Sequence, residues 1–354
     1  MTALLAPRTT VLFGPNWFAS VMGTGIVATA AASLPVPVPG LRQLATVVWV
    51  LAALLLAAVI VAAAVHGRSH ADDPVMIHFW GAPPMALMTV GAGTLLLGRG
   101  WLGDAAAVIV DAVLWGAGTL LGLAVAVAVP YRMMTGRGAG PEAAFGGWLM
   151  PVVSPMVSAA TGALLVPHVP FREDMLLACY AMAGLSLFAA VIVITQLWSR
   201  LVASPPGAAR TVPTLWIVLG PIGQSVTAFH LLGRAAQGVL PEPYATGAQM
   251  LAVLYGVPAL GFALFWAALA AAITVRTARA GLPFSLTWWS FTFPVGTVVT
   301  GLSGMAARTG SHLLAALAVA FYAALAGAWM VVAARTARGA RRGDLWRVPT
   351  PAHR

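Results

Sequence analysis

The chain has 354 residues, of which 60% are hydrophobic and only 8% are charged. A soluble domain carries roughly 25% charged residues, so the composition excludes an ordinary soluble protein and indicates an all-α protein that crosses a membrane many times. The formal net charge is +10, but the arginines fall in predicted loops and in the C-terminal tail, which indicates membrane orientation and excludes a nucleic-acid partner.

Two residue types are scarce in this chain. All 19 basic residues are arginine, and Cys179 is the only cysteine. The missing lysine excludes a Walker-type phosphate site and a Schiff base. The single cysteine excludes disulfides within the chain and cysteine-based metal sites. A high content of alanine and arginine without lysine is typical of a GC-rich bacterial genome.

Apolar segments of about 20 residues predict helices that span a bilayer. The loops between these segments are short, so the sequence predicts a single transmembrane transport domain over residues 1–354. Ten spans are predicted, at residues 14–34, 43–65, 77–98, 105–130, 146–167, 174–199, 212–233, 245–273, 284–306 and 310–335, followed by a basic cytoplasmic tail at 336–354.

The arginines predict which side of the membrane each loop faces. With the N-terminus inside, 14 arginines lie in inner segments and five in outer loops, and an arginine excess marks the cytoplasmic side. Because the number of spans is even, both termini are expected in the cytoplasm, with the protein in a bacterial plasma (inner) membrane. The outer arginines are Arg42, Arg99, Arg172, Arg234 and Arg308.

Asp111 is the one acidic residue inside a predicted span. It lies about two turns from the start of the fourth span, since a helix turns once in about 3.6 residues. A position near the membrane interface and a role in a proton relay both fit this placement.

The odd-numbered spans share a pattern of a tryptophan near the start and a proline or glycine soon after it. A proline inside a helix removes a backbone hydrogen bond and bends the helix, so the pattern predicts kinked helices. The simplest account is a helical hairpin repeated five times, with five kinked helices around one axis and five plain helices outside them. The predicted kinks are at Pro84, Pro151, Pro155, Pro221 and Pro294.

Small and polar residues recur at helical spacing in the odd spans, which predicts one polar face on each. Five such faces that converge on the axis would line a narrow path. An alternative is that each stripe only allows close helix packing, as small residues often do in membranes. The predicted pore-lining residues are Ser20, Gly23, Thr24, Thr89, Gly93, Ser154, Ser158, Thr161, Gly220, Gln224, Thr227, Gly296, Thr297 and Thr300.

The ninth span contains the most distinctive stretch, WWSFTFPVG at residues 288–296. At helical spacing, Phe293 shares a face with glycine and threonine, whereas Phe291 shares a face with apolar residues. A large hydrophobic side chain in a pore closes it by occlusion or dewetting. Phe293 is therefore the predicted pore gate, and Phe291 is expected to face packing or lipid.

No aspartate, glutamate, histidine or arginine lies at the centre of a predicted stripe, which argues against an obvious proton pump and favours a weakly interacting anion path. A G-x-G-x-x-G match at residues 98–103 has no strand before it, so it does not predict a dinucleotide site. The histidines at 66, 70 and 78, with aspartates at 72 and 73, match no standard metal spacing. The sequence predicts no enzyme, no cofactor and no metal site.

Four segments together resemble the tellurite-resistance/dicarboxylate transporter family, which includes TehA-like bacterial channels, plant slow-type anion channels, malate permeases and sulfite efflux pumps. They are GPNWF with VMGTGI at 14–26, GWLMPVV at 147–153, LGPIGQ at 219–224 and WWSFTFP at 288–294. The likeness extends over all ten spans.

The resemblance implies ten helices in five hairpins, in a quasi-five-fold arrangement around a central pore, and a homotrimer with one pore in each subunit. It also implies that a phenylalanine of the ninth helix closes the pore, a role that falls on Phe293 by motif position. The expected function is transport of small anions or organic acid anions, such as chloride, nitrate, sulfite or malate. The alternative is a proton-coupled C4-dicarboxylate carrier or a sulfite/tellurite efflux transporter.

Overall fold

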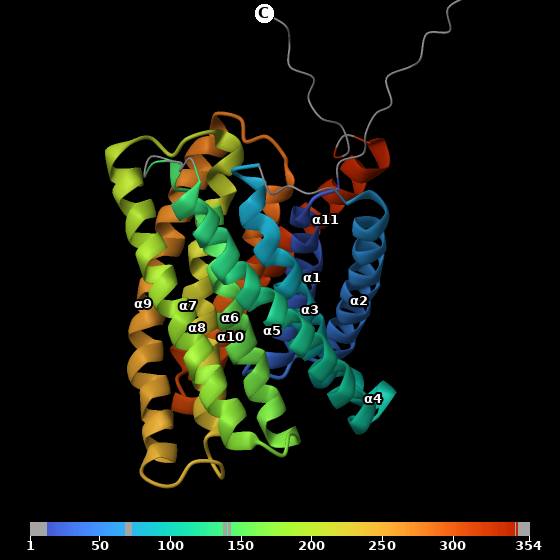
Figure 1. The fold of residues 1–354 in the computed structure, drawn as a ribbon, viewed down its shortest axis with the longest axis vertical. Coiled ribbons are helices and arrows are strands. Elements are labelled where there is room, and N and C mark those ends of the chain that lie inside the picture. Colours follow the sequence, from blue (N-terminus) through green and yellow to red (C-terminus); the bar gives the residue numbers. More distant parts are fainter. Residues whose placement is uncertain (1–12, 68–72, 137–139, 141–142, 344, 346–354) are drawn as a thin grey trace, which may run out of the picture.

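The computed structural model describes residues 13–67, 73–136, 140, 143–343 and 345. Nearly all of them are helical (Figure 1). Most of the predicted basic tail lies outside the described residues. So do five of the arginines used to predict orientation (Arg8, Arg68, Arg137, Arg347 and Arg354) and two members of the discounted metal cluster, His70 and Asp72.

Ten longer α-helices make up the described fold, together with the short helix α4 (Arg99–Leu102). Each predicted span overlaps one of them. Their bounds are α1 (Phe18–Ser33), α2 (Leu41–His66), α3 (Ala82–Gly93), α5 (Asp104–Thr135), α6 (Leu149–Leu165), α7 (Arg172–Ala203), α8 (Leu219–Ala235), α9 (Tyr244–Arg279), α10 (Phe293–Thr309) and α11 (His312–Arg342).

The helices are those of a multi-pass membrane protein. In the described residues, eight helical stretches are long and apolar enough to cross a membrane. The two remaining α-helices, α1 and α10, have 16 and 17 residues. Large apolar side chains on the outside of the molecule, such as Leu54, Phe188 and Leu254, are between 65% and 75% exposed, as lipid-facing residues would be.

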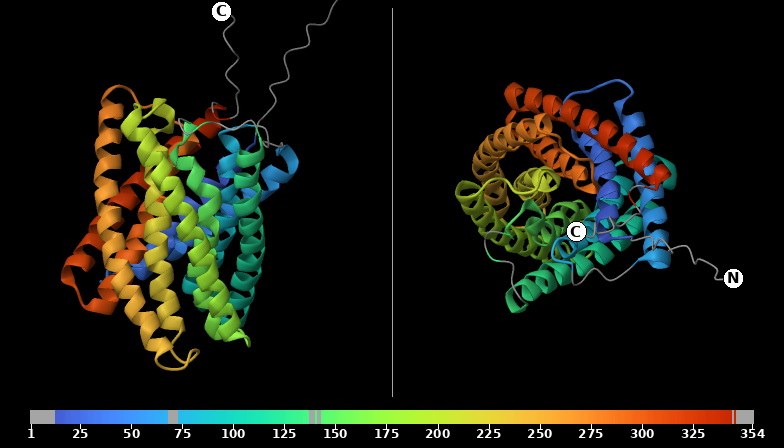
Figure 2. Two further views of the ribbon diagram at one scale, coloured as in Figure 1. Left: turned by 60° about the vertical axis from the view of Figure 1, so that its left-hand side comes forward. Right: turned by 90° about the horizontal axis from the view of Figure 1, so that it is seen from above.

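The helices form an inner bundle and an outer layer (Figure 2). The stretches that contain α3, α6 and α8 are 89%, 94% and 72% buried, whereas α2, α5, α7, α9 and α11 are only 17–33% buried. Each of the inner helices α1, α3, α6 and α8 contacts the next inner helix in chain order, and α10 contacts α1. Each inner helix also contacts the outer helix that follows it in the chain.

Tryptophans of the outer layer form hydrogen bonds to the inner bundle. Four indole N–H groups on outer helices donate hydrogen bonds of 2.9–3.3 Å to inner segments. A buried indole needs such a partner, and its large apolar ring adds packing energy. The pairs are Trp49 to the Val90 carbonyl, Trp115 to the Ser158 carbonyl, Trp266 to the Leu215 carbonyl and Trp329 to Thr24 Oγ1.

Every inner helix begins with a 3₁₀ segment, and this changes the meaning of the prolines. The segments are η1 (Pro15–Trp17), η2 (Met76–Gly81), η5 (Gly146–Trp148), η7 (Ala209–Val218) and η8 (Leu286–Phe291). Four of the predicted kink prolines lie within the first three residues of the α-helix that follows, where backbone N–H groups lack a partner within the α-helix. These are Pro84, Pro151, Pro221 and Pro294.

These four prolines therefore mark where α-helix begins, and not bends in the middle of a span. Of the five, only Pro155 lies beyond the first turn of its α-helix, in α6. The 3₁₀ segments occupy the first part of each odd-numbered span, which the sequence predicts as one continuous α-helix.

Candidate functional site

Two cavities lie within the inner bundle, one on each side of Phe293. The narrow cavity has a volume of about 20 Å³. It is lined almost entirely by large apolar side chains and glycine. The lining residues are Ala19, Met22, Phe79, Met85, Met150, Val153, Ile217, Gly220, Leu286, Trp289, Ser290, Phe293 and Pro294.

The wide cavity has a volume of about 320 Å³. Its lining combines small apolar residues with hydroxyl, amide, imidazole and guanidinium groups. The lining residues are Ile26, Thr29, Ala32, Ser33, Thr89, Ala92, Leu96, Val157, Ala160, Thr161, Leu164, Gln224, Thr227, His230, Leu231, Arg234, Phe293, Thr300, Ser303, Gly304 and Ala307.

Phe293 is the one described residue that lines both cavities. It is the first residue of α10 and is only 3% exposed. Phe291, two residues earlier, packs instead against Trp216 and Trp288, with ring centroids 5.8 and 5.7 Å away. The two phenylalanines of the WWSFTFP stretch thus have different surroundings: one ring separates two cavities, and the other joins an aromatic cluster.

The position of Phe293 depends on a close approach between α1 and the start of α10. Gly23 of α1 faces this point, and a β-carbon there would overlap Thr292 Oγ1 and come within 2.6 Å of Trp289 Cε3. Thr292 itself donates to the Trp289 carbonyl at 2.7 Å, and the Trp289 indole donates to Thr336 Oγ1 at 3.1 Å. Glycine is therefore required at position 23 for this packing.

Six of the predicted pore-lining residues line one of the cavities. Gly220 lines the narrow cavity. The other five line the wide cavity, where the Thr227 and Thr300 hydroxyls form a 2.7 Å hydrogen bond between α8 and α10. Those five are Thr89, Thr161, Gln224, Thr227 and Thr300.

The remaining predicted residues are absent from the described linings of both cavities, and two of them lie at contacts between inner and outer helices. Gly93 packs against the Trp49 ring, and Thr24 accepts the Trp329 indole. Ser20 donates to the Trp17 carbonyl at 2.7 Å. Gly93 and Thr24 illustrate the close packing that small residues permit between membrane helices, whereas the Ser20 bond stays within its own helical stretch.

The predicted residues on α6 and α10 also make helix contacts. Ser154 donates to the Gly81 carbonyl at 3.1 Å, and Ser158 lies 3.1 Å from Met88 Sδ. Thr297 donates to the Leu219 carbonyl at 3.1 Å, and a β-carbon at Gly296 would overlap Ile26. Each hydroxyl is therefore already engaged in helix packing.

Several lining residues were not predicted from the sequence: Thr29, Ser33, His230, Arg234 and Ser303. On α8 a signal was present, because steps of three or four residues from Gln224 and Thr227 lead to His230 and Arg234 on the same face. Ser303 follows Thr300 by the same rule. The sequence predicted an axis without charges, but the guanidinium group of Arg234 lines the wide cavity, beside the imidazole of His230.

Three side chains of the wide cavity carry a buried polar atom without a hydrogen-bond partner in the described structure: Gln224 Oε1, His230 Nδ1 and Ser303 Oγ. Gln224 is 5% exposed and Ser303 is 1% exposed. An unpartnered buried polar group costs roughly 1–3 kcal/mol. These groups remain available to hydrogen-bond a polar solute in the wide cavity.

At the α4 end of the bundle a third cavity, of about 620 Å³, adjoins the wide cavity. The two share Leu96, Leu164, Leu231 and Arg234 in their linings. Four of the five arginines predicted to face outward line this third cavity, which we call the arginine vestibule. They are Arg42, Arg99, Arg172 and Arg234.

Asp111 lies in α5, away from these cavities. Its side chain is fully buried, and neither carboxylate oxygen has a hydrogen-bond partner among the residues described. A β-carbon at Gly91 would lie 2.6 Å from Asp111 Oδ1, so the carboxyl group packs against α3. A buried acidic group within a membrane helix is a candidate for function.

Across the described ranges, no group of three or more histidine, cysteine, aspartate or glutamate residues is close enough to hold a metal ion. Cys179 is buried against Gly162, where it fills a small space between helices.

Comparison with known proteins adds to this geometry. The family model SLAC1, voltage-dependent anion channel, matches residues 12–337. The sulfite efflux pump SSU1 of Arthroderma otae is 26% identical over 345 residues, which cover 92% of this chain and 90% of the pump. SSU1 of Trichophyton rubrum is also 26% identical, covering 95% and 92%. An uncharacterized transporter of Methanocaldococcus jannaschii is 25% identical, covering 81% and 82%.

Proposed function

This chain belongs to the voltage-dependent anion channel family, and we propose that it moves small anions through its inner bundle along a path that Phe293 closes. The membership confirms the resemblance carried by the four sequence motifs. It also fits a transport protein and not an enzyme.

The observation that carries the proposal is that Phe293 alone, in the described linings, is shared by the narrow and wide cavities. An anion that passes from one cavity to the other must pass this ring. A hydrophobic side chain at such a point stops conduction by occlusion or by excluding water. In this proposal the observed state is closed, and opening requires Phe293 to move aside.

The proposed pore is formed by five helical hairpins in a quasi-five-fold arrangement. Two observations support it. The inner helices α1, α3, α6, α8 and α10 contact one another in a closed cycle, and each of them supplies residues to both cavities. Each also begins with a 3₁₀ segment. Repeats that cross the membrane in the same direction are related by an axis along the membrane normal.

The proposed substrates are small anions or organic acid anions, such as chloride, nitrate, sulfite or malate. The described linings of the two cavities and of the vestibule include no aspartate or glutamate. The wide cavity offers hydroxyl and amide groups, and the vestibule offers four guanidinium groups. Such a path has no acidic group to repel an anion, and its polar groups can replace part of the hydration shell of the anion.

An ion-replacement flux assay tests this function. The purified protein in liposomes, with voltage and pH clamped, would be given chloride, nitrate, sulfite and malate in turn. We expect anion flux that rises by about tenfold or more in Phe293→Ala, the change that about 1.4 kcal/mol less barrier would give. Wild-type and variant proteins that pass no anion would refute the function, whereas equal flux in both would refute only the gate.

A second candidate is a proton-coupled carrier for C4-dicarboxylates, or a sulfite or tellurite efflux transporter. Two observations favour it: the similarity to fungal sulfite efflux pumps, and the buried, unpartnered carboxyl group of Asp111. Coupling predicts that a pH gradient alone drives anion flux and that Asp111→Asn abolishes this drive. Flux that follows voltage and ignores the pH gradient would exclude the carrier.

The proposed setting is a homotrimer in a bacterial plasma membrane, with both termini in the cytoplasm. More of the described arginines lie at the helix ends opposite the vestibule than at the vestibule end. Examples are Arg276, Arg279, Arg338 and Arg341. By the positive-inside rule this end is cytoplasmic, so the vestibule faces outward. Native mass spectrometry tests the homotrimer. Protease protection of a tagged C-terminus tests the orientation.

A further inference from the structure

The arginine vestibule gathers positive charge from four separate elements. Arg42 comes from the first turn of α2, Arg99 from α4, Arg172 from the start of α7 and Arg234 from the last turn of α8. They surround a space of about 620 Å³ at the α4 end of the molecule. No single helix or loop explains their convergence.

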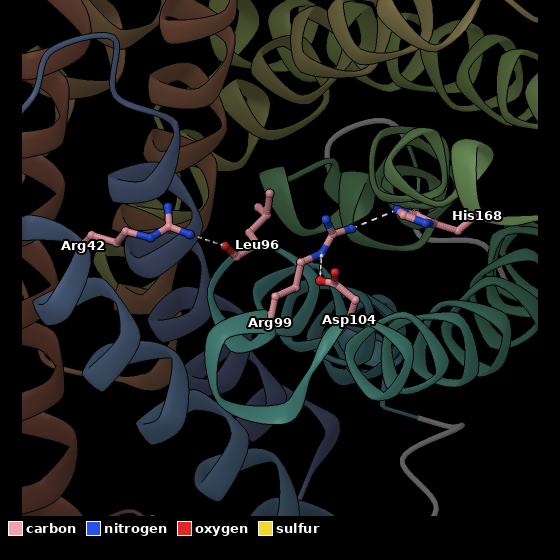
Figure 3. A network of polar contacts seen from close by, with 5 residues as sticks. All are labelled: Arg42, Leu96, Arg99, Asp104 and His168. Carbon is pink, nitrogen blue, oxygen red and sulfur yellow. Dashed lines mark hydrogen bonds and ion pairs between the residues drawn. The ribbon is translucent and has the colours of Figure 1, made fainter.

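Hydrogen bonds hold two of these guanidinium groups in place without neutralising them (Figure 3). Arg42 Nη2 donates to the Leu96 carbonyl at 2.9 Å. Arg99 Nη2 lies 2.9 Å from His168 Nε2, which must accept because arginine only donates. Neither partner, a backbone carbonyl or an imidazole, carries a negative charge that would neutralise the arginine.

The described lining of the vestibule includes no acidic residue, although Asp104, Glu173 and Asp174 lie in first helix turns at the same end of the molecule. At the vestibule, Arg99 Nε forms an ion pair with Asp104 Oδ1, at 3.8 Å (Figure 3). Its side chains are 40% and 84% exposed, and such exposed pairs contribute little. Four like charges around one cavity repel one another, so an anion bound between them would be stabilised.

The vestibule also leads directly into the proposed path. It shares Leu96, Leu164, Leu231 and Arg234 with the lining of the wide cavity. The Leu96 carbonyl that positions Arg42 belongs to a residue of that shared wall. A cluster of one sign of charge at a cleft raises the local concentration of the opposite ion.

We propose that the arginine vestibule binds a small, doubly charged oxyanion at the mouth of the path and so favours such anions over halides. The inference rests on the proposed function. Guanidinium groups present flat pairs of N–H donors that match two oxygens of one oxyanion. A spherical halide offers only one acceptor atom to such a pair of N–H groups, and it carries only half the charge of a sulfite or sulfate dianion.

Thermal stability of the purified protein in detergent tests the site directly, because a ligand that binds the folded state raises the melting temperature. The probes are sodium sulfate and sodium chloride at matched ionic strength. We expect sulfate to raise the melting temperature more than chloride does. Arg42→Gln and Arg172→Gln should each lose most of this difference while remaining folded.

Arg308→Gln is the matched control. Arg308 lies at the same end of the bundle, but it donates to Gln249 Oε1 at 3.0 Å and is not part of the described vestibule lining. This variant should keep the full sulfate effect. An equal rise with both salts in the wild type, or equal losses in Arg308→Gln and Arg42→Gln, would overturn the proposal.

A lipid phosphate could satisfy the same chemistry, so a second arm adds phosphatidylglycerol to the detergent. We expect sulfate to stabilise the protein without this lipid and to add to any effect that the lipid has. If phosphatidylglycerol gives the whole rise and sulfate adds nothing, the ligand is a lipid headgroup and the proposal is wrong.

A transport assay separates this inference from the proposed function. In phosphatidylcholine liposomes, Arg172→Gln should raise the KM for sulfite by about threefold or more, with kcat unchanged and a smaller change for chloride. Equal changes for the two anions would mean nonselective steering and overturn the site. If the wild type transports nothing, the proposed function fails, and the sulfate-dependent melting temperature still decides whether the site exists.

Discussion

The narrow and wide cavities are lined by the same five helices, yet they differ in size by more than tenfold, about 20 against 320 Å³. On the narrow side, three helices contribute methionines at the constriction: Met22, Met85 and Met150. One to two turns further along, the same helices contribute small or hydroxyl-bearing residues such as Thr29 and Thr89. The comparison teaches that one set of helices can form both an apolar constriction and a wider cavity with polar groups.

The two sides also differ in how the backbone is built. The narrow side lies at the junctions between 3₁₀ segments and α-helices, and η8 itself contributes Leu286, Trp289 and Ser290 to it. The wide side is formed by α-helix except at Leu96, which lies in the π-helical segment η3 (Thr94–Gly98). Along the proposed path, the cost of removing water from an anion is therefore concentrated on the narrow side.

The largest effect is expected from filling the narrow cavity. A β-carbon at Gly220 would meet no atom within 4 Å, so Gly220→Leu should direct its side chain into the cavity. Anion flux should fall by about tenfold or more, because almost no free volume exists there to lose. The measurement is flux in liposomes.

Gly261→Leu is the control for this substitution. A β-carbon at Gly261 would also meet no atom within 4 Å, but this glycine lies on the exposed face of α9. The flux of this variant should equal that of the wild type. If Gly220→Leu conducts as well as this control, the narrow cavity is not on the path.

A smaller effect is expected from removing polar groups of the wide cavity. Gln224→Ala and Ser303→Ala each delete a buried polar group that has no protein partner in the described structure. Each should reduce anion flux by about three- to tenfold, the equivalent of one lost hydrogen bond of about 1 kcal/mol. Neither variant should lower the melting temperature.

Ser225→Ala provides the comparison for these two variants. Ser225 neighbours Gln224 and is fully buried, but it hydrogen-bonds Tyr255 at 2.6 Å on the α9 side. Its loss should lower stability and leave flux unchanged. Flux that is equally sensitive to Ser225 and Ser303 would show that polarity of the wide cavity has no special role.

The smallest effect on transport is expected at Phe291. Phe291→Ala removes the ring contacts with Trp216 and Trp288, and a truncated aromatic side chain in packing costs up to about 3–5 kcal/mol. The melting temperature should fall while flux per folded protein stays within about twofold of the wild type. A flux increase as large as that of Phe293→Ala would place both rings on the gate.

The sequence predicted much of the fold. Hydrophobic segments identified an all-helical membrane protein, and four motifs identified the family, which the match over residues 12–337 confirms. The 3₁₀ segments were not predicted, because the prolines at the start of the α-helices that follow them also fit kinks within a longer helix. Pro294 is an example, since it follows the first residue of α10.

The lining of the cavities was harder to predict than the fold, and α1 shows why. The polar stripe of Ser20, Gly23 and Thr24 suggested one face, whereas the cavities are lined by Met22, Ile26 and Thr29. One residue along a helix turns the face by about 100°. Hydroxyls in a helix can bond their own backbone, as Thr24 does to the Ser20 carbonyl, so polarity alone does not identify the face toward a cavity.

Accessibility of single cysteines on either side of Phe293 tests the central claim most directly. The natural Cys179 is fully buried, so background labelling should be low. A negatively charged methanethiosulfonate reagent, added from the vestibule side, should modify Thr300→Cys in the wide cavity but not Gly220→Cys in the narrow cavity. In a Phe293→Ala background, Gly220→Cys should become modified from the same side. Equal modification of Gly220→Cys with and without the Phe293 ring would contradict the account.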